Sequence, residues 1–268
     1  TPNNGVMTNL QVIKTIVEMC VEAGAIRSNI TICEGSAGFK NGVRDPGYTV
    51  RQMTWQSFSN YAINTIPGVN LVDANDCGTG NYYPSYPGYT GGYSTANHYY
   101  YYQTTAPQNT PATQRPDLYV DRLYAIPKVV VDCDYFIRVP CLKNHDLAGV
   151  TGALKLAFGL APADIYHIAN PGAWLGKWNL LHQWQNVPWS GVGSELENNA
   201  RGMVDMTLLR PPDLVVCDGL VGIYTGPTRE PGGVLGQANP RMACIIASTD
   251  PVAADTVECL AMGYRVDS

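Results

Sequence analysis

Asp-Leu-Val-Val-Cys at residues 213–217 and Met-Ala-Cys-Ile-Ile-Ala at residues 242–247 are the two stretches that decide the fold. Both are short, continuous apolar runs, a pattern typical of β-strands that are covered on both faces. Asp250 and Pro251 follow the second run and predict the start of a helix, which Gly263 is expected to end. The C-terminal part of the chain is therefore predicted to be a strand followed by a helix.

Helices and strands also alternate through the rest of the chain. Apolar residues recur at helical spacing from Thr8 to Ala23, and Gly24 predicts the end of that helix. Further strands are predicted at 29–33, 69–72 and 135–139, and further helices at 55–66, 149–158 and 194–208. Because the segments between strands are long enough for crossovers, we expect an α/β fold with a mostly parallel sheet layered with helices.

The chain is expected to be one domain that is a piece of a longer protein. Its 268 residues can bury a substantial core, so residues 1–268 are interpreted as a single α/β domain. Thr1 opens the sequence without a methionine, and Ser268 follows closely on the predicted end of the last helix. We therefore expect further elements beyond the two ends.

Residues 76–114 are crowded with tyrosine, glycine, proline, asparagine and threonine, and include four consecutive tyrosines at 99–102. This composition predicts an irregular insertion outside the core of the domain. Two interpretations of the insertion stay open. Its tyrosines could pack on the domain with their hydroxyl groups in water, or they could form a contact surface, because tyrosine offers a large rigid area with a polar tip. The second interpretation predicts self-association.

Charge and hydropathy exclude two classes of partner. The net charge is -5 and the isoelectric point is near 5.3, so the chain lacks the cationic field that binding to a nucleic acid requires. The sequence contains no apolar run of the length that a membrane span needs. Charged residues make up only 15% of the chain, and together with the cysteine content this favours an exported or periplasmic protein over a cytoplasmic one.

The 8 cysteines contain no CxxC motif, which argues against a zinc or iron–sulfur cage built from neighbouring residues. Some of them lie inside apolar periodic segments, where cysteine is usually a small buried hydrophobe. These are Cys20, Cys33, Cys217, Cys244 and Cys259. An oxidised, disulfide-containing protein is the competing interpretation.

Polar residues follow the predicted strands at their carboxyl ends. Ligands bind there in open parallel sheets, because loops and helix N-termini converge at that edge. The candidates at the strand ends are Glu34, Lys143, His145, Asp218 and Asp250, and the helices that come next add Thr151, Lys155 and Asp255.

The segment after the strand at 135–139 is the richest of these. Lys143 and His145 are two positions apart on an extended segment, so their side chains are expected on one side. With Lys155 and Thr151 nearby, a cationic pocket would result that suits a carboxylate, a phosphate or an anionic cofactor. His145 could instead be a metal ligand, a general acid or base, or an ordinary hydrogen-bonded loop histidine.

The three aspartates have simpler alternatives. Capping the next helix explains Asp250 fully. Asp218, followed by a glycine, fits a turn after a strand. Asp255 lies among apolar neighbours inside the last predicted helix, so it either faces the crevice or caps a buried amide.

Three motifs in these segments resemble a known family. Residues 141–145 (Cys-Leu-Lys-Asn-His) and 149–155 (Gly-Val-Thr-Gly-Ala-Leu-Lys) are similar to the Lys-Thr-His and Thr-Gly-x-x-Lys-Asn signature of the domain-of-unknown-function 362 family. Residues 218–222 with Gly226-Pro227 resemble its Asp-Gly-Ile and Gly-Pro loop, and residues 248–255 resemble its Asp-Pro-Val-Ala-x-Asp helix start. Asn144 stands where the family usually has threonine, and Leu156 where it has asparagine.

The resemblance implies little about chemistry, because the family is named for lacking a known function. Some of its members are attached to iron–sulfur modules or carry export signals. A divalent metal and an iron–sulfur partner module are therefore the cofactors that we consider.

Two functions follow from the sequence. The first is a small-molecule enzyme or a redox accessory protein. In it Lys143, His145 and Lys155 hold a small anionic ligand, while Asp218 or Asp250 supplies a carboxylate for a metal or for proton transfer. The second is a non-catalytic extracytoplasmic surface or assembly protein that uses the tyrosine-rich insertion as its contact surface.

Overall fold

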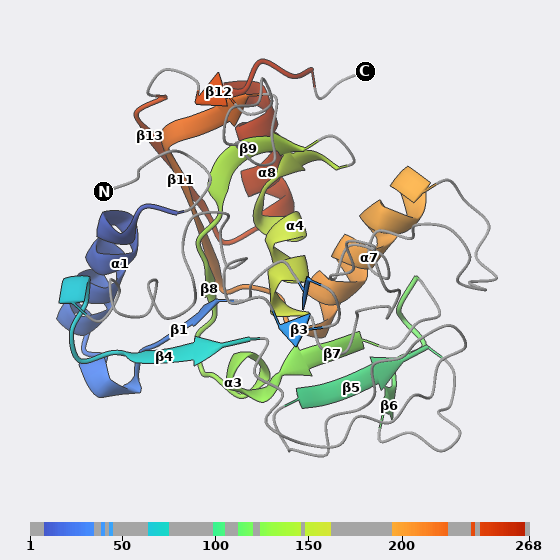
Figure 1. Cartoon of the computed structure of the whole chain (residues 1–268), viewed down its shortest axis with the longest axis horizontal. Helices are drawn as coiled ribbons and strands as arrows, with labels where there is room; N and C mark the ends of the chain where they lie inside the picture. The colour runs from blue at the N-terminus through green and yellow to red at the C-terminus, as the bar shows by residue number, and fades with distance from the viewer. Residues whose placement is uncertain are drawn as a thin grey trace.

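The computed structural model describes residues 8–34, 39–40, 43–44, 64–74, 99–104, 112–119, 124–145, 148–161, 195–224, 237–238 and 242–265. The helices are α1 (Leu10–Glu22), α3 (Lys128–Val131), α4 (Ala153–Leu156), α7 (Glu195–Leu209) and α8 (Pro251–Ala261), with 3-10 turns η1 (Arg27–Asn29) and η3 (Ala157–Leu160). The strands of the small sheets are β1 (Thr31–Glu34), β2 (Phe39–Lys40), β3 (Val43–Arg44), β4 (Asn70–Asp73), β5 (Tyr99–Gln103), β6 (Thr113–Gln114) and β7 (Tyr124–Pro127). The strands of the largest sheet are β8 (Ile137–Arg138), β9 (Cys141–His145), β10 (Gly149–Thr151), β11 (Leu214–Tyr224), β12 (Gln237–Ala238) and β13 (Cys244–Ser248) (Figure 1).

The largest sheet is mixed, and β11 is its centre. β11 pairs in parallel with β8 and β9 but antiparallel with β12 and β13, and β9 pairs antiparallel with β10. The predicted α/β class is confirmed, whereas the prediction of a mostly parallel sheet is wrong. β9 ends at His145 and β10 begins at Gly149, a connection far too short for the crossover that parallel strands need.

The two stretches that decided the fold differ in their surroundings. In β11, Val215, Cys217 and Asp218 are all buried, as expected of a strand covered on both faces. β13 instead alternates between half-buried and exposed residues, and Ile245 is 48% exposed. Among the described strands β13 pairs with β11 alone, so it lies at an edge and only one of its faces is covered.

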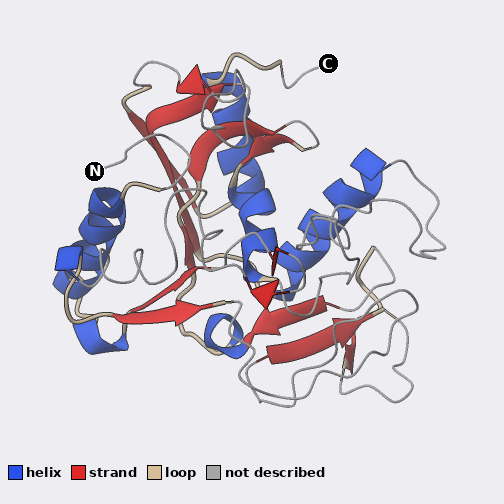
Figure 2. Cartoon of the chain, in the orientation of Figure 1, coloured by secondary structure: helices blue, strands red, loops and turns tan. Residues whose placement is uncertain are grey.

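Helices lie on both sides of β11 (Figure 2). On one side the N-cap residue of α1, Asn9, donates its backbone N–H to Asp218. On the other side Ala153 of α4 and Ala254 of α8 pack against Val215. The sheet is therefore a layer between α1 and the group of α4 and α8.

The predicted helix ends are confirmed, because they depend on local chemistry. Asp250 caps α8 ahead of Pro251, as predicted; the N-cap of α1, Asn9, was not predicted, and its side chain accepts the N–H of Gln11. Gly24 and Gly263 have φ angles of +105° and +83°, the left-handed conformation that glycine tolerates at a helix end.

The helix predicted at 149–158 begins later than expected. Residues 149–151 form β10 and pair with β9, and the helical residues start only at Ala153 and pass into η3. The strand predicted at 135–139 is reduced to the two residues of β8. Most of the helix predicted at 55–66 lies outside the described residues.

The tyrosine-rich segment contributes to the core. β5 pairs with β6 and β7, and Tyr99 and Tyr101 of β5 are 4% and 6% exposed in the largest hydrophobic cluster. For its described residues, the prediction that 76–114 lies outside the core is wrong, since alternate tyrosines of a strand point inward. These two buried tyrosines cannot form a contact surface. Residues 75–98 and 105–111 lie outside the described part of the chain.

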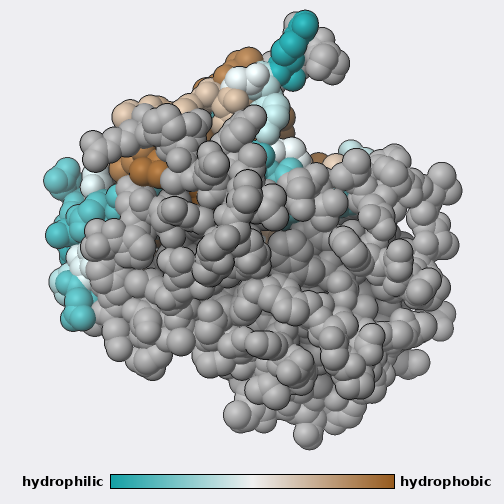
Figure 3. All heavy atoms as spheres, turned by 45° about the horizontal axis from the view of Figure 1, so that its top comes forward, coloured by the Kyte–Doolittle hydropathy of each residue, from teal (hydrophilic) through white to brown (hydrophobic). Residues whose placement is uncertain are grey.

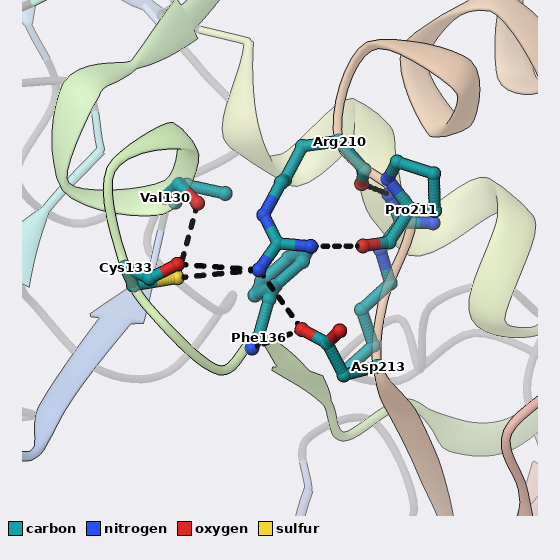
Figure 4. Close-up of polar contacts among 7 residues, drawn as sticks. Val130, Cys133, Phe136, Arg210, Pro211 and Asp213 are labelled. Atoms are coloured by element: carbon teal, nitrogen blue, oxygen red, sulfur yellow. Dashed lines mark hydrogen bonds and ion pairs between the residues drawn. The ribbon is translucent and has the colours of Figure 1, made fainter.

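Hydrogen bonds from Arg210 join the start of β11 to the segment before β8 (Figure 4). Its Nη2 donates to the carboxylate of Asp213 (2.9 Å) and to the backbone carbonyl of Cys133 (3.3 Å). The same carboxylate oxygen of Asp213 accepts the backbone N–H of Phe136 (2.8 Å), and the Phe136 ring lies under the guanidinium. These contacts hold the starts of the parallel strands β8 and β11 beside each other.

Within the described residues, no helix has the length and hydropathy of a membrane span.

Candidate functional site

The hairpin of β9 and β10 carries three of the predicted site residues. Lys143 is paired in register with Thr151, and His145 is paired with Gly149. Side chains two positions apart on a strand point to the same face, so Lys143 and His145 share a face, with Thr151 beside Lys143 on it. The predicted side-by-side arrangement of the lysine and the histidine thus follows from the extended backbone.

These three residues differ in exposure. His145 is 4% exposed, whereas Lys143 and Thr151 are half-buried. Thr151 Oγ1 is buried and has no hydrogen-bond partner among the residues that the structure describes. Gly149 is exposed, and no atom of the described residues lies within 4 Å of the position that a Cβ would take there. An unsatisfied hydroxyl group therefore lies beside a lysine, close to a part of the hairpin with open space.

Asp218 lies inside β11 and not in a turn after it, so the turn interpretation is wrong. Its neighbour in register on β9 is Cys141, which places it on the face that carries Lys143. The carboxylate is 1% exposed and accepts the backbone N–H groups of Asn9 (2.7 Å) and Leu220 (3.0 Å). Because Asn9 caps α1, Asp218 satisfies a donor at the start of that helix and ties α1 to the central strand.

Asp250 and the hairpin lie at opposite ends of β11, because β13, the strand before Asp250, runs antiparallel to β11. β13 runs antiparallel to β11 and its last residue pairs with Val215, near the start of β11. The hairpin lies at the other end of β11, where Lys143 pairs with Ile223. His145 is in turn four positions beyond Cys141, about 13 Å along an extended strand. The strand ends therefore do not converge at one edge as predicted.

Both aspartates of the last helix are caps. Asp250 Oδ1 accepts the N–H groups of Val252 (2.8 Å) and Ala253 (3.2 Å), as the simpler interpretation predicted. Asp255 is 8% exposed and accepts the N–H groups of Ala153 (2.5 Å) and Leu154 (3.0 Å) at the start of α4. Of its two predicted alternatives, Asp255 caps a buried amide. Burial raises its pKa, although these two N–H groups and Arg138 act in the opposite direction.

Lys155 and Glu34 are not on the face of the sheet that carries Lys143. Lys155 is on α4, on the side of the sheet that Val215 faces, and its Nζ lies 5.4 Å from the ring centroid of Phe158. Glu34 ends β1, which pairs with β4 in a separate sheet, and its carbonyl accepts the N–H of Ala74 (2.8 Å). Of the predicted residues, only Lys143, Thr151, His145 and Asp218 share one face of one sheet.

Four cysteines lie on the largest sheet or on α8 beside it. Burial raises the pKa of Cys141, Cys217, Cys244 and Cys259. Lys143 acts in the opposite direction on Cys141, but burial is the larger effect. Such thiols are weak nucleophiles, because the thiolate is the reactive form. Of the five cysteines interpreted as buried hydrophobes, Cys217 is buried and the other four are half-buried.

In the described part of the chain, no group of three or more His, Cys, Asp or Glu side chains is arranged to hold a metal ion.

Arg138 is a buried charge that sequence reasoning missed. It is 2% exposed, and its Nη1 donates to the carbonyl of Ala153 (3.0 Å) and to the hydroxyl of Thr207 (2.9 Å). Burial lowers its pKa to about 10, and Asp255 acts against this effect. An arginine between apolar residues of a predicted strand was the available signal.

Glu258 is the second missed group. Its side chain is fully buried beside the thiol of Cys217. Burial, together with the nearby Asp255, raises its pKa to about 8. Its position three residues after Asp255 and four after the buried Ala254 places it on the inner face of α8. That spacing was readable from the sequence.

Comparison with known proteins identifies a family but no activity. No curated protein matches the chain. Among solved structures, the lactate racemase apoprotein from Thermoanaerobacterium thermosaccharolyticum is 14% identical with a TM-score of 0.36, over 92% of this chain and 54% of that one. The chain thus spans about half the length of that protein. Residues 92–259, more than half of the chain, match the family model described as a domain of unknown function, DUF362. The chain therefore belongs to the DUF362 family.

Proposed function

We propose that the chain binds a small anion, a carboxylate or a phosphate, on the β9–β10 hairpin. Lys143 supplies the positive charge and Thr151 the hydroxyl donor. The observation that carries the proposal is the buried Oγ1 of Thr151, which lacks a hydrogen-bond partner among the described residues while Thr151 is paired in register with Lys143. A buried polar group without a partner costs free energy, so a ligand that accepts its hydrogen bond is stabilised there.

The chemistry of this face favours an anion over a cation. A lysine ammonium group is a donor with no acceptor capacity, and a hydroxyl group can donate to an anionic oxygen. Asp218, the carboxylate on the same face, is already bonded to the N–H groups of Asn9 and Leu220. These two backbone N–H groups therefore stabilise the negative charge of Asp218, one of them at the start of α1. On the described part of the hairpin, Lys143 and Thr151 would both present donors to such an anion.

His145 extends the proposal from binding to catalysis. It is two positions from Lys143 on the same face, about 7 Å along the strand. An imidazole at that separation could exchange a proton with a ligand held by Lys143 and Thr151, since histidine titrates near neutral pH. The proposed function is therefore that of an enzyme, or of a binding protein, for a small carboxylate or phosphate.

Calorimetric titration with phosphate and with malonate, at constant ionic strength, tests the proposal. At least one of the two anions is expected to bind the unaltered chain. Lys143→Met should weaken binding about tenfold or more, because a hydrogen bond to a charged group contributes about 1.5–3 kcal/mol. Thr151→Val, which keeps the shape of the side chain, should weaken binding by a smaller factor.

Lys14→Met is the matched control, since Lys14 lies on α1 and is also half-buried. It should leave the affinity unchanged. The proposal fails if neither anion binds, or if Lys14→Met weakens binding as much as Lys143→Met does. The latter result would mean that the anions respond to the net charge of the chain and not to the hairpin.

A further inference from the structure

The last helix directs a carboxylate into the protein. Figure 3 shows hydrophilic residues at the surface on its left side, where α1 lies in Figure 1, whereas Asp255 of α8 is only 8% exposed. Burying a carboxylate is costly unless hydrogen-bond donors surround it. Asp255 has such donors in the N–H groups of Ala153 (2.5 Å) and Leu154 (3.0 Å), the first two residues of α4. The side chain of Asp255 therefore holds the start of α4.

The residue before α4 is packed against the same carboxylate. The space that a Cβ would occupy on Gly152 is filled by the carboxyl group of Asp255. Gly152 itself provides no side-chain cap for α4, and Asp255 supplies the acceptors in its place. Residues 152–154 thus all contact one side chain. Their backbone cannot rotate without moving Asp255 or breaking its hydrogen bonds.

Thr151, the hydroxyl donor of the proposed anion site, is the residue immediately before Gly152. On its other side, the β9–β10 hairpin pairs Thr151 with Lys143. The backbone of Thr151 is consequently held from two directions, by the hairpin and by Asp255. Because the side chain of threonine is branched at Cβ, its χ1 angle depends closely on the backbone that carries it. The direction of the Thr151 hydroxyl group therefore depends on the position of Asp255.

Asp255 is itself held in place by its surroundings. Ala254, the preceding residue, packs with Ala153 against Val215 of the central strand. Arg138, buried on β8, donates to the carbonyl of Ala153 (3.0 Å) and so holds the same corner between β10 and α4. Asp255 thus lies on the side of the sheet that Val215 faces, opposite to the proposed anion site. It can act on the anion only through Thr151.

We propose that Asp255 is a positioning residue of the anion site, because it holds Thr151 Oγ1 in the direction in which the hydroxyl group donates to a ligand bound by Lys143. The inference rests on the function proposed above. It gives α8 a part in anion binding without any contact between α8 and the ligand. The contact of Asp255 with residues 152–154, next to Thr151, is the observation that carries it.

A double-mutant cycle tests the proposal, with calorimetric titration of phosphate and of malonate at constant ionic strength. Asp255→Asn keeps the shape of the side chain but leaves one acceptor for two N–H donors. It should weaken anion binding about threefold or more, by the same factor as Thr151→Val, because both changes remove one neutral hydrogen bond to the anion. The double variant should bind no more weakly than Thr151→Val alone. A general loosening of the fold would instead weaken binding in both backgrounds.

Asp250→Asn is the matched control, because it makes the same change in the exposed cap at the start of α8. It should leave the affinity for the anion unchanged. Circular dichroism verifies the folding of each variant. If Asp255→Asn unfolds, Gly152→Ala replaces it, since a Cβ at that position displaces the Asp255 carboxylate. Multiplied losses of affinity in the double variant would overturn the proposal.

Methyl NMR of Thr151 provides a measurement that needs no ligand. Three-bond couplings to its γ-methyl group report whether χ1 occupies one rotamer or several. The unaltered chain and Asp250→Asn should show one rotamer, and Asp255→Asn should show a different rotamer or an average of several. An unchanged rotamer in Asp255→Asn overturns the proposal, whether or not an anion binds. If the rotamer changes as expected but neither anion binds the unaltered chain, Asp255 positions Thr151 and it is the proposed function that fails.

Discussion

Asp255 Oδ1, in the middle of α8, accepts a hydrogen bond of 2.5 Å from the backbone N–H of Ala153, the first residue of α4. Asp255 Oδ2 accepts the N–H of Leu154. One carboxylate therefore replaces the N-cap side chain that α4 lacks, since Gly152 precedes the helix. It also stabilises the charge of the buried Arg138. The contact joins two segments about 100 residues apart into one packed layer.

Replacing Asp255 should destabilise the fold strongly. Asp255→Ala leaves two buried N–H groups without an acceptor and removes the carboxylate that stabilises Arg138, a loss of about 3–5 kcal/mol in the free energy of unfolding. Urea denaturation measures it. Asp250→Ala is the matched control, because it removes an exposed cap of the same residue type and should cost about 1 kcal/mol. Equal losses in the two variants would contradict the capping role of Asp255.

A methyl group at position 152 should break the same contact. A Cβ on Gly152 would overlap the carboxylate of Asp255, and Asp255 is held by two N–H groups of the adjoining helix. Gly152→Ala is therefore expected to cost about 1–3 kcal/mol, as overpacking does in a filled interior. At Gly159, a Cβ would have no neighbour within 4 Å among the described residues, so Gly159→Ala should be neutral or slightly stabilising in the same denaturation experiment. A stable Gly152→Ala variant would argue against a tight approach of α8 to α4.

Elements with local signals were predictable from the sequence. Asp250, Gly24 and Gly263 determine their helix ends through contacts within a few residues or through their own backbone conformation, and the structure agrees with the prediction at each of them. The apolar run of β11 likewise predicted a buried central strand. These features need no information about the rest of the chain.

Features that depend on distant partners were not predictable in this way. The polar character of Thr151 is visible in the sequence, but its pairing with Lys143 depends on a hairpin register that competes with a helical pattern. Tyr99 is buried because β5 pairs with β7, which its own composition does not reveal. The direction of β13 decides that Asp250 lies far from the hairpin, and strand direction has no signature within the strand itself.

The hydroxyl group of Tyr124 should be essential to the packing of α7 on the tyrosine-containing sheet. It donates to Asp205 Oδ2 at 2.6 Å, and both residues are fully buried. Tyr124→Phe removes one donor from a buried carboxylate and should lower the free energy of unfolding by about 1–3 kcal/mol. Thermal unfolding followed by circular dichroism measures the change.

Tyr100→Phe provides the comparison for this variant. The Tyr100 hydroxyl donates to Asp132 at 3.3 Å on an exposed part of the same sheet, so its loss should have little effect on stability. If the two tyrosine variants unfold at the same temperature, the Tyr124–Asp205 hydrogen bond does not stabilise the fold.

Glu258 should make the stability of the chain fall as the pH rises through neutrality. Its pKa is about 8 in the folded chain against 4.5 as the ordinary value, so the folded state holds a proton that the unfolded state releases. The favourable contribution of this proton is complete below about pH 4.5 and is lost progressively as the pH rises to about 8. Over that interval the loss amounts to a few kcal/mol, because one pKa unit corresponds to about 1.4 kcal/mol.

Urea denaturation at a series of pH values between these limits, for the unaltered chain and for Glu258→Gln, separates this effect from the other titrating groups. Glutamine keeps the shape of the protonated acid and does not ionise, so the variant should lose the decline in stability that the unaltered chain shows. Glu22→Gln, on the outer part of α1, controls for the loss of one negative charge and should keep the decline. An unchanged pH profile in Glu258→Gln would mean that Glu258 is ionised at neutral pH and that a positively charged group lies beside it, because a buried carboxylate without such a partner could not hold its charge.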